Sequence, residues 1–360
     1  MKRCTRCVLP ETVPGITFNQ DGICNFCLNV KLEENHGEEE FGNIIDSIIK
    51  EDNKYDCIVP LSGGRDSAYV LYLAKAKYNM KVLAVNYDHE FRTKQALINM
   101  QNACSKLNID FISYRSKRDI AQKIVKYNII SSISGKKIRF PTLCRACSYG
   151  RHSVVYRTAE EYGVPLILWG DSKAESTSDI GQKSFDLLHR KKPKLIQIFD
   201  YLKRFSFYRK EYYSLLQRLE FHVPGNSILS IKKPKLRNKN IKEIHVFDYL
   251  LWEREKIKDT ITRELGWSAP PQSVSTWRTD CMLIPLENHY FYRLFGCGKP
   301  AFAYCTMINI GQMHREEALR QDDEMSGNIE EEVRELLENN IGLSKKGVKK
   351  ILSFQKNDFL

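Results

Sequence analysis

A turn with two adjacent glycines, Ser62-Gly63-Gly64-Arg65-Asp66-Ser67, joins a predicted strand (55–61) to a predicted helix (68–78). Two glycines let the backbone turn tightly, so its N–H groups can surround an anion, and the start of the next helix adds partial positive charge. The turn is not a Walker loop, because no Gly-Lys-Ser/Thr follows. We predict that it binds phosphates, with Ser62 and Ser67 as hydroxyl donors and Asp66 acting through Mg²⁺.

Strand and helix predictions alternate from residue 55 to about residue 171. Apolar runs at 81–89, 110–116 and 165–171 predict strands, and residues 93–107 predict a helix. Strands separated by helices favour a parallel, doubly wound α/β sheet. The predicted organisation is a cysteine-rich ribbon and connector (1–40), a nucleotide-binding domain (41–180), a basic aromatic helical insert (181–240) and a mostly helical substrate or partner region (241–360).

Eleven cysteines in a chain without a secretory signal indicate metal binding or chemistry rather than disulfides. Four of them form two Cys-x2-Cys pairs separated by sixteen residues: Cys4, Cys7, Cys24 and Cys27. Four thiolates at this spacing can close a tetrahedral Zn²⁺ site, which is structural because no coordination position stays open for a substrate. Cys57 and Cys104 lie in apolar settings and are predicted to be core residues.

The pair Cys144 and Cys147 allows two interpretations. It can be half of a second metal site, with Cys281 or Cys297 as a candidate third ligand, or it can be two packed thiols at the start of a helix.

The net charge of +12 comes almost entirely from one segment. Residues 190–240 hold fourteen Lys or Arg against three acids, which gives +11. Apolar residues from Leu195 to Leu219 follow one helical face, so we predict a helix that packs this face on protein and presents its charge outward. No apolar run is long enough to cross a membrane and Met1–Pro10 lacks a signal core, so we expect a cytoplasmic protein.

The C-terminal region contains a polar and aromatic cluster, Ser275-Thr276-Trp277-Arg278-Thr279-Asp280-Cys281. Trp277 offers a stacking face, while Arg278 and Asp280 offer directional hydrogen bonds. These three residues are therefore candidates for binding a sugar-like substrate. The alternative is a helical cap with buried tryptophans.

The SGGRDS turn resembles the pyrophosphate loop of the N-type ATP pyrophosphatases, the PP-loop enzymes. That family has a Rossmann-like adenine-nucleotide-hydrolase fold and splits ATP into AMP and pyrophosphate. The resemblance implies that Asn86 and Tyr87, at the end of the second predicted strand, lie near the adenine and ribose. It also assigns Gly170 and Asp171 to a second, looser nucleotide-facing motif.

A closer resemblance covers nearly the whole chain apart from the basic insert. A series of segments resembles the N-acetyl sugar amidotransferase family of bacterial surface-polysaccharide (lipopolysaccharide, O-antigen) and nonulosonic, pseudaminic-type acid biosynthesis. These segments are CTRCVLPETVPGITFNQDGICNFC, SGGRDSAY, TLCRAC, DYLLWE, LGWSAPP, STWRTDC and MINIGQMHREEAL.

This resemblance implies a reaction and partners. ATP adenylates the acetamido oxygen of an N-acetyl sugar, and ammonia then displaces AMP to give an acetamidino sugar. The chain has no glutaminase signature, so ammonia is expected from a separate glutaminase acting with a barrel-type subunit. The sugar is free or nucleotide-linked, and nucleic acid is not an expected partner.

Two alternatives stay open. One is a PP-loop tRNA-thiolating enzyme, because some relatives of that kind hold an iron–sulfur cluster with a Cys-x2-Cys pair and one distant cysteine, here Cys144, Cys147 and Cys281. The basic insert also fits this alternative, since it could bind phosphates. The other is a non-catalytic scaffold with a relict nucleotide site, against which the intact SGGRDS turn argues.

Overall fold

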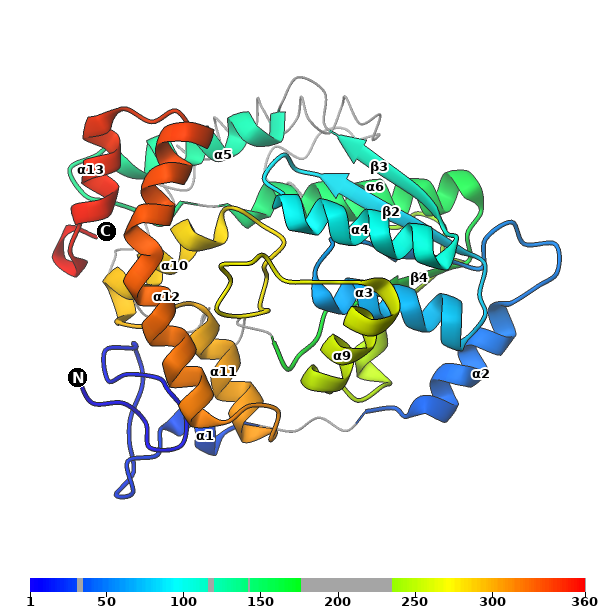
Figure 1. Ribbon diagram of the computed structural model, residues 1–360, viewed down its shortest axis with the longest axis horizontal. Coiled ribbons are helices and arrows are strands. Elements are labelled where there is room, and N and C mark those ends of the chain that lie inside the picture. The colour runs from blue at the N-terminus through cyan, green and yellow to red at the C-terminus, as the bar shows by residue number, and fades with distance from the viewer. Residues whose placement is uncertain (31–34, 116–119, 142, 176–234, 360) are drawn as a thin grey trace.

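The computed structural model describes residues 1–30, 35–115, 120–141, 143–175 and 235–359 (Figure 1). The predicted basic insert, including the apolar face from Leu195 to Leu219, lies almost entirely outside the described residues. In the part of the chain that the structure describes, no helix is both long and apolar enough to span a membrane.

The centre of the fold is a parallel sheet. Its strands, in the order β3-β2-β1-β4-β5, are β1 (Cys57–Pro60), β2 (Val82–Asp88), β3 (Asp110–Arg115), β4 (Leu166–Trp169) and β5 (Lys242–His245). Every pairing between neighbours is parallel. The predicted parallel α/β sheet is therefore confirmed, and its first four strands lie within the predicted runs. Their carboxyl ends share one edge, where ligands bind in open α/β sheets.

Strand residues alternate between two hydrophobic clusters, as a period of two requires. Val59 and Leu168 belong to the larger core, on the side of helices α3 (Arg65–Tyr72) and α9 (Arg254–Leu265). Ile58 and Ile167 face the other cluster, which includes Val155 of helix α6 (Cys144–Tyr162). Both faces are buried, and this explains why β1 and β4 are continuous apolar runs.

Helices precede and separate the strands of the sheet, and further helices form the C-terminal region. The α-helices are α1 (Asn25–Leu28), α2 (Glu38–Ile48), α3 (Arg65–Tyr72), α4 (Lys94–Leu107), α5 (Ile120–Ile133), α6 (Cys144–Tyr162), α9 (Arg254–Leu265), α10 (Ile284–Phe295), α11 (Pro300–Asn309), α12 (Arg315–Glu335) and α13 (Lys345–Ser353). Two π-helical turns, η1 (Leu73–Lys77) and η4 (Leu336–Asn340), extend α3 and α12, and 3-10 turns span Val246–Asp248 and Lys356–Asp358.

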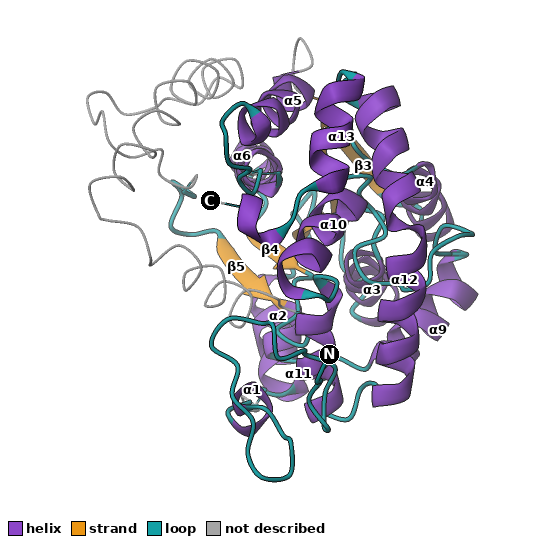
Figure 2. Cartoon of the chain, turned by 90° about the vertical axis from the view of Figure 1, so that its left-hand side faces the viewer, coloured by secondary structure: helices purple, strands orange, loops and turns teal. Residues whose placement is uncertain are grey.

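Strand β5 was not predicted from the sequence. Three of its four residues are exposed and only Ile244 is buried, because β5 pairs with β4 alone among the described strands (Figure 2). The sheet therefore takes a strand from the stretch that was predicted to be mostly helical. Helices α9 to α13 confirm the helical character of the rest of that stretch.

The N-terminal ribbon packs against the C-terminal helices, far away in sequence (Figure 1). Arg315, the first residue of α12, donates hydrogen bonds to the carbonyl oxygens of Cys4 and Cys7. Arg3 forms an ion pair of 2.9 Å with the buried Asp322 of the same helix. These contacts make the ribbon part of the C-terminal core rather than an independent module.

Candidate active site

The phosphate loop lies between the end of β1 and the start of α3. Gly63 has a φ of +80°, and a Cβ on it would lie 2.2 Å from the carbonyl oxygen of Ala96, so no other residue fits there without a backbone shift. A Cβ on Gly170, after β4, would lie 3.1 Å from the carbonyl oxygen of Asp66. The loop is thus held closely by α4 on one side and by the end of β4 on the other.

Hydroxyl groups shape the inside of the loop. The Oγ atoms of Ser62 and Ser67 are 3.2 Å apart, and the Ser62 Oγ accepts a hydrogen bond from the N–H of Gly64 at 3.2 Å. The Ser67 hydroxyl also donates to the Gly64 carbonyl at 3.1 Å. Both serines that were predicted as phosphate donors therefore face the same turn.

The loop opens into a cavity of about 430 Å³ at the carboxyl edge of the sheet. Most of the predicted site residues line it: Ser62, Gly64, Asp66, Ser67, Tyr87, Cys144, Cys147, Gly170, Asp171, Trp277, Arg278, Asp280 and Cys281. Two do not. Gly63 turns its carbonyl away from the cavity to accept hydrogen bonds from Trp267 and Asn99, and Asn86 is buried between Ser113 and Arg92.

Segments that are far apart in the sequence meet at this loop. The indole N–H of Trp252 donates to the Asp66 carboxylate at 3.3 Å, and that of Trp267 donates to the Gly63 carbonyl at 3.0 Å. The Thr276 hydroxyl accepts from Arg65 at 2.7 Å. The DYLLWE, LGWSAPP and STWRTDC segments therefore each supply at least one direct contact to the loop or to the first residues of α3.

Arg65 and Glu175 were missed by the sequence analysis. The Arg65 guanidinium is buried, lies 5.0 Å from the centre of the Trp252 ring and forms ion pairs with Asp66 at 3.0 Å and Glu175 at 2.5 Å. Burial, only partly offset by Arg65, raises the pKa of Glu175 to about 7. Glu175 thus gives the cavity a carboxyl group that titrates near neutral pH.

Arg92, which follows β2, was also missed. It forms an ion pair of 3.0 Å with Asp280 and donates to the amide oxygen of Asn86 at 3.0 Å. Burial acts to raise the pKa of Asp280, but Arg92 and Arg278 outweigh it and hold that pKa below its ordinary value. Asp280 therefore stays ionised and acts as a hydrogen-bond acceptor on the cavity wall.

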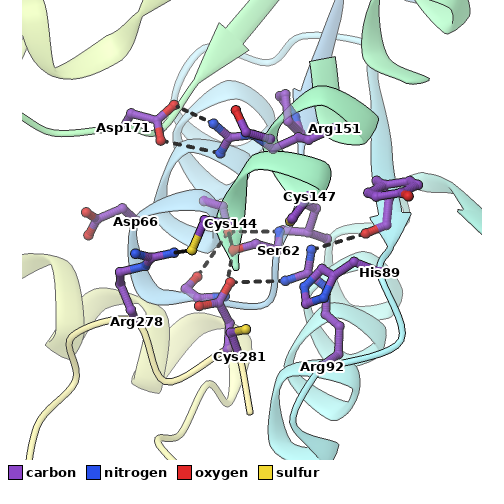
Figure 3. Close-up of a pocket in the computed structure, with 18 of the residues that line it drawn as sticks. Ser62, Asp66, His89, Arg92, Cys144, Cys147, Arg151, Asp171, Arg278 and Cys281 are labelled. Atoms are coloured by element: carbon purple, nitrogen blue, oxygen red, sulfur yellow. Dashed lines mark hydrogen bonds and ion pairs between the residues drawn. The ribbon is translucent and has the colours of Figure 1, made fainter. Parts of the chain in front are cut away.

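Figure 3 shows that the guanidinium of Arg278 is directed at the thiol of Cys144. Arg278 has a φ of +48°, and its Nη2 lies 3.7 Å from the Cys144 Sγ. That thiol also lies 3.6 Å from a carboxylate oxygen of the buried Glu287, which Lys299 binds at 2.9 Å. On the other side of the cavity, Arg151 pairs with Asp171 at 3.4 Å and lies over the Trp169 ring.

Cys144, Cys147 and Cys281 line the cavity together, as the metal-site interpretation requires. They differ from the N-terminal cysteines, which are the group of potential ligands within 4.8 Å of one another among the described residues. Burial raises the pKa of all three thiols. Cys297 is buried outside this wall, so of the two candidate third ligands only Cys281 reaches the cavity.

The N-terminal thiols of Cys4, Cys7, Cys24 and Cys27 are buried and converge. Two Sγ–Sγ distances are 3.9 Å (Cys4 to Cys27) and 3.8 Å (Cys7 to Cys24). A tetrahedron with Zn–S bonds of about 2.3 Å has edges of about 3.8 Å, so the thiols fit a Zn²⁺ ion. The predicted cluster is therefore present and can hold a metal.

Some of the residues that the sequence analysis missed stand beside sequence signals that could have identified them. Arg65 stands inside the glycine turn itself, but its contacts come from residues up to 211 positions away. Arg92 and Glu175 follow β2 and β4, and residues after the carboxyl ends of parallel strands are general candidates for a ligand site. Glu287 lies within a helix and carries no such signal.

Comparison with known proteins finds a family model that spans the phosphate loop. The family model described as queuosine biosynthesis protein QueC matches residues 56–139, from β1 past α5. An uncharacterized protein of Methanocaldococcus jannaschii is 27% identical over 227 residues, which cover 62% of this chain and 74% of that protein. A tRNA(Ile)-lysidine synthase of Clostridium tetani is 31% identical over 110 residues, but the match spans only 27% of this chain and 23% of that enzyme.

Two solved structures show a low overall similarity to this chain. The NH3-dependent NAD synthetase of Campylobacter jejuni is 22% identical with a TM-score of 0.29, and the match covers 38% of this chain and 56% of that one. The U34-tRNA thiolase NcsA of Methanococcus maripaludis, solved with its [4Fe-4S] cluster, is 13% identical with a TM-score of 0.37, over 92% and 88% of the chains. The family match covers a segment that includes the phosphate loop and strands β1 to β3.

Proposed function

We propose that the protein is an ATP-dependent, AMP-forming amidotransferase that converts the acetamido group of an N-acetyl sugar into an acetamidino group. One observation carries the proposal: the phosphate loop and the segment Trp277–Asp280 line the same cavity. An ionised Asp280 and the aromatic face of Trp277 suit a polar sugar ring. A substrate bound there would present its acetamido oxygen next to phosphates held by Ser62 and Ser67.

The chemistry needs positioning more than it needs a covalent nucleophile. The acetamido oxygen attacks the α-phosphorus of ATP, and pyrophosphate leaves toward the loop. Ammonia then adds to the activated carbon, and AMP departs with the former acetamido oxygen while a proton is lost from nitrogen. Glu175, with a pKa of about 7, is the carboxyl group on the cavity wall best suited to accept that proton.

Ammonia is proposed to come from a separate glutaminase that acts with a barrel-type subunit. The proposal rests on the family resemblance and on the allocation of the chain: the sheet, the ribbon and the C-terminal helices account for the described residues. The isolated chain is then expected to use ammonium and to fail with glutamine. Its rate with ammonium should rise with pH, because free NH3 is the nucleophile.

Mass spectrometry of the products tests the reaction. The purified chain is incubated with ATP, Mg²⁺, ammonium and a panel of N-acetyl sugars, with pyrophosphate release measured in parallel. We expect a product lighter than its substrate by the difference between O and NH, formed much more slowly by Ser62→Ala. Pyrophosphate release without any such product would overturn the amidotransferase proposal while leaving the nucleotide site in place.

A second candidate function is ATP-dependent thiolation of tRNA. The specific observation in its favour is that Cys144, Cys147 and Cys281 line the cavity beside the loop, where amidation does not require thiols. These residues could hold an iron–sulfur cluster, which would supply the site for the transferred sulfur. Thiolation replaces oxygen by sulfur, so the product becomes heavier rather than lighter. Anaerobic reconstitution with iron and sulfide, with Cys281→Ser as control, tests this alternative.

A further inference from the structure

Helix α11 brings a fifth thiol to the N-terminal cysteine cluster. Cys305 is fully buried, and its Sγ lies 3.6 Å from the Cys27 Sγ, closer than either of the distances of 3.9 and 3.8 Å within the four-cysteine set. Nothing in the sequence spacing indicated this residue, because it lies 278 positions after Cys27. The contact depends on the packing of α1 against α11.

A second side chain of the same helix approaches the same sulfur. The Nδ2 of Asn309, one turn after Cys305, lies 3.2 Å from the Cys27 Sγ and donates to the Cys305 carbonyl at 2.7 Å. Cys27 is thus contacted from α11 by both a thiol and an amide.

These contacts can offset the negative charge of a cysteine cluster that holds a metal ion. Four thiolates around a divalent ion leave a buried net charge of −2, which hydrogen-bond donors must offset. Backbone N–H groups of Cys7 and Cys24 approach the Cys4 sulfur, and that of Cys27 approaches the Cys24 sulfur. For Cys27, the donors within reach include the thiol of Cys305 and the amide of Asn309.

We propose that Cys305 belongs to the metal centre: it donates its S–H to Cys27 when four thiolates hold the ion, and it replaces Cys27 as a ligand when Cys27 is lost. The separation of 3.6 Å between the two sulfurs is close to one edge of a Zn–S tetrahedron. The Cys305 sulfur therefore lies next to the ligand position that the Cys27 sulfur occupies. This inference does not depend on the proposed reaction.

Metal content of single and double variants tests the replacement. After purification with Zn²⁺ and elemental analysis, we expect Cys27→Ser to keep most of its zinc and the double variant Cys27→Ser, Cys305→Ser to lose it. Cys4→Ser is the matched control, because the sulfur contact of Cys305 at 3.6 Å is with Cys27. Equal zinc loss in Cys27→Ser and Cys4→Ser would overturn the replacement role.

A second measurement uses variants that keep all four primary thiols. Zinc transfer to a chromogenic chelator is timed for Cys305→Ala and for Cys297→Ala, since Cys297 is equally buried in the same region but interacts with Asp322 instead. We expect release to be several-fold faster in Cys305→Ala and unchanged in Cys297→Ala. Equal release rates in both variants would exclude Cys305 from the metal centre, even if Cys27→Ser failed to fold.

Discussion

Two hydroxyl groups and one carboxylate define the loop at the scale of single residues. The Ser62 hydroxyl accepts from the N–H of Gly64 and faces Ser67, so it shapes the turn that a phosphate would enter. Asp66 is already bound by Arg65 and Trp252 but keeps free lone pairs on both oxygens. The same carboxylate can therefore anchor the C-terminal segment and serve Mg²⁺.

Removing the Ser62 hydroxyl should slow ATP cleavage without unfolding the protein. We expect Ser62→Ala to lower kcat for pyrophosphate release by about 10²- to 10³-fold, the usual effect of deleting one donor to a developing charge. Asp66→Ala should nearly abolish the release. Ser47→Ala is the control, because Ser47 is exposed on α2 and its hydroxyl donates to the carbonyl of Ile44, away from the loop. A folded Ser62→Ala protein with the parental rate would refute the nucleotide assignment.

Glu175 should make stability depend on pH in a defined window. Burial raises its pKa in the folded state from 4.5 to about 7, so between these values the folded protein holds a proton that the unfolded chain has released. Stability contributed by the protonated form is present below pH 4.5 and is lost as the pH rises to 7, by on the order of 3 kcal/mol.

The Glu175→Gln variant should lack this loss. Thermal unfolding followed from pH 5 to pH 8 should show a falling midpoint for the parent and a flatter profile for Glu175→Gln. Glu161→Gln, on the exposed end of α6, should retain the parental profile. Parallel profiles for all three proteins would show that Glu175 is not the titrating group.

At the scale of elements, the two glycines of the loop have different structural roles. Gly63 has a left-handed backbone and lies against the backbone of α4, whereas Gly64 has a φ of −75° and its nearest obstacle is the Ser62 Oγ, at 3.1 Å. We expect Gly63→Ala to cost about 1–3 kcal/mol or more in unfolding free energy and to abolish ATP binding. Gly64→Ala should fold with near-parental stability. Urea denaturation measures the difference, and equal losses would contradict the assigned strain.

Element types were predictable where the local pattern was strong. The strand–turn–helix around the loop, β2, α4, β3 and β4 all follow from apolar periodicity and the glycines. Strand β5 was not predictable, since only Ile244 of its residues is buried and its place depends on pairing with β4. The same limit applies to the site: the serines of the loop stand in one motif, but Arg92 and Asp280 meet only because β2 and the loop before α10 converge.

At the scale of the whole molecule, the N-terminal cysteine cluster packs directly against the C-terminal helices. Arg315 binds the carbonyl oxygens of Cys4 and Cys7, and α11 contacts Cys27 through Cys305. Chelating the metal should therefore increase hydrogen exchange in residues 1–30, α11 and the start of α12, while β1 and β2 stay protected. Cys4→Ser, Cys24→Ser should behave like the chelated parent. Increased exchange confined to residues 1–30 would show that the ribbon folds separately.

The basic segment calls for a test on the complete assembly. Residues 190–230 can be replaced by a short Gly/Ser linker that keeps Glu175, the contacts of Arg237 and Asn238 with Glu160, and β5. If the segment docks an acidic partner subunit, the deletion should spare ammonium-dependent turnover but weaken glutamine-dependent turnover with the glutaminase present.

The parent's advantage in that assay should also fade as salt rises, because exposed charges are screened over about 8 Å at physiological ionic strength. Reversing four of the lysines and arginines to glutamate within the full-length chain provides the control, since it keeps the length of the segment and lowers its net charge by eight. Docking predicts that both variants lose glutamine use alike. A folded deletion variant that fails even with ammonium would instead assign the segment to the active site, where its charge would face the nucleotide or the sugar.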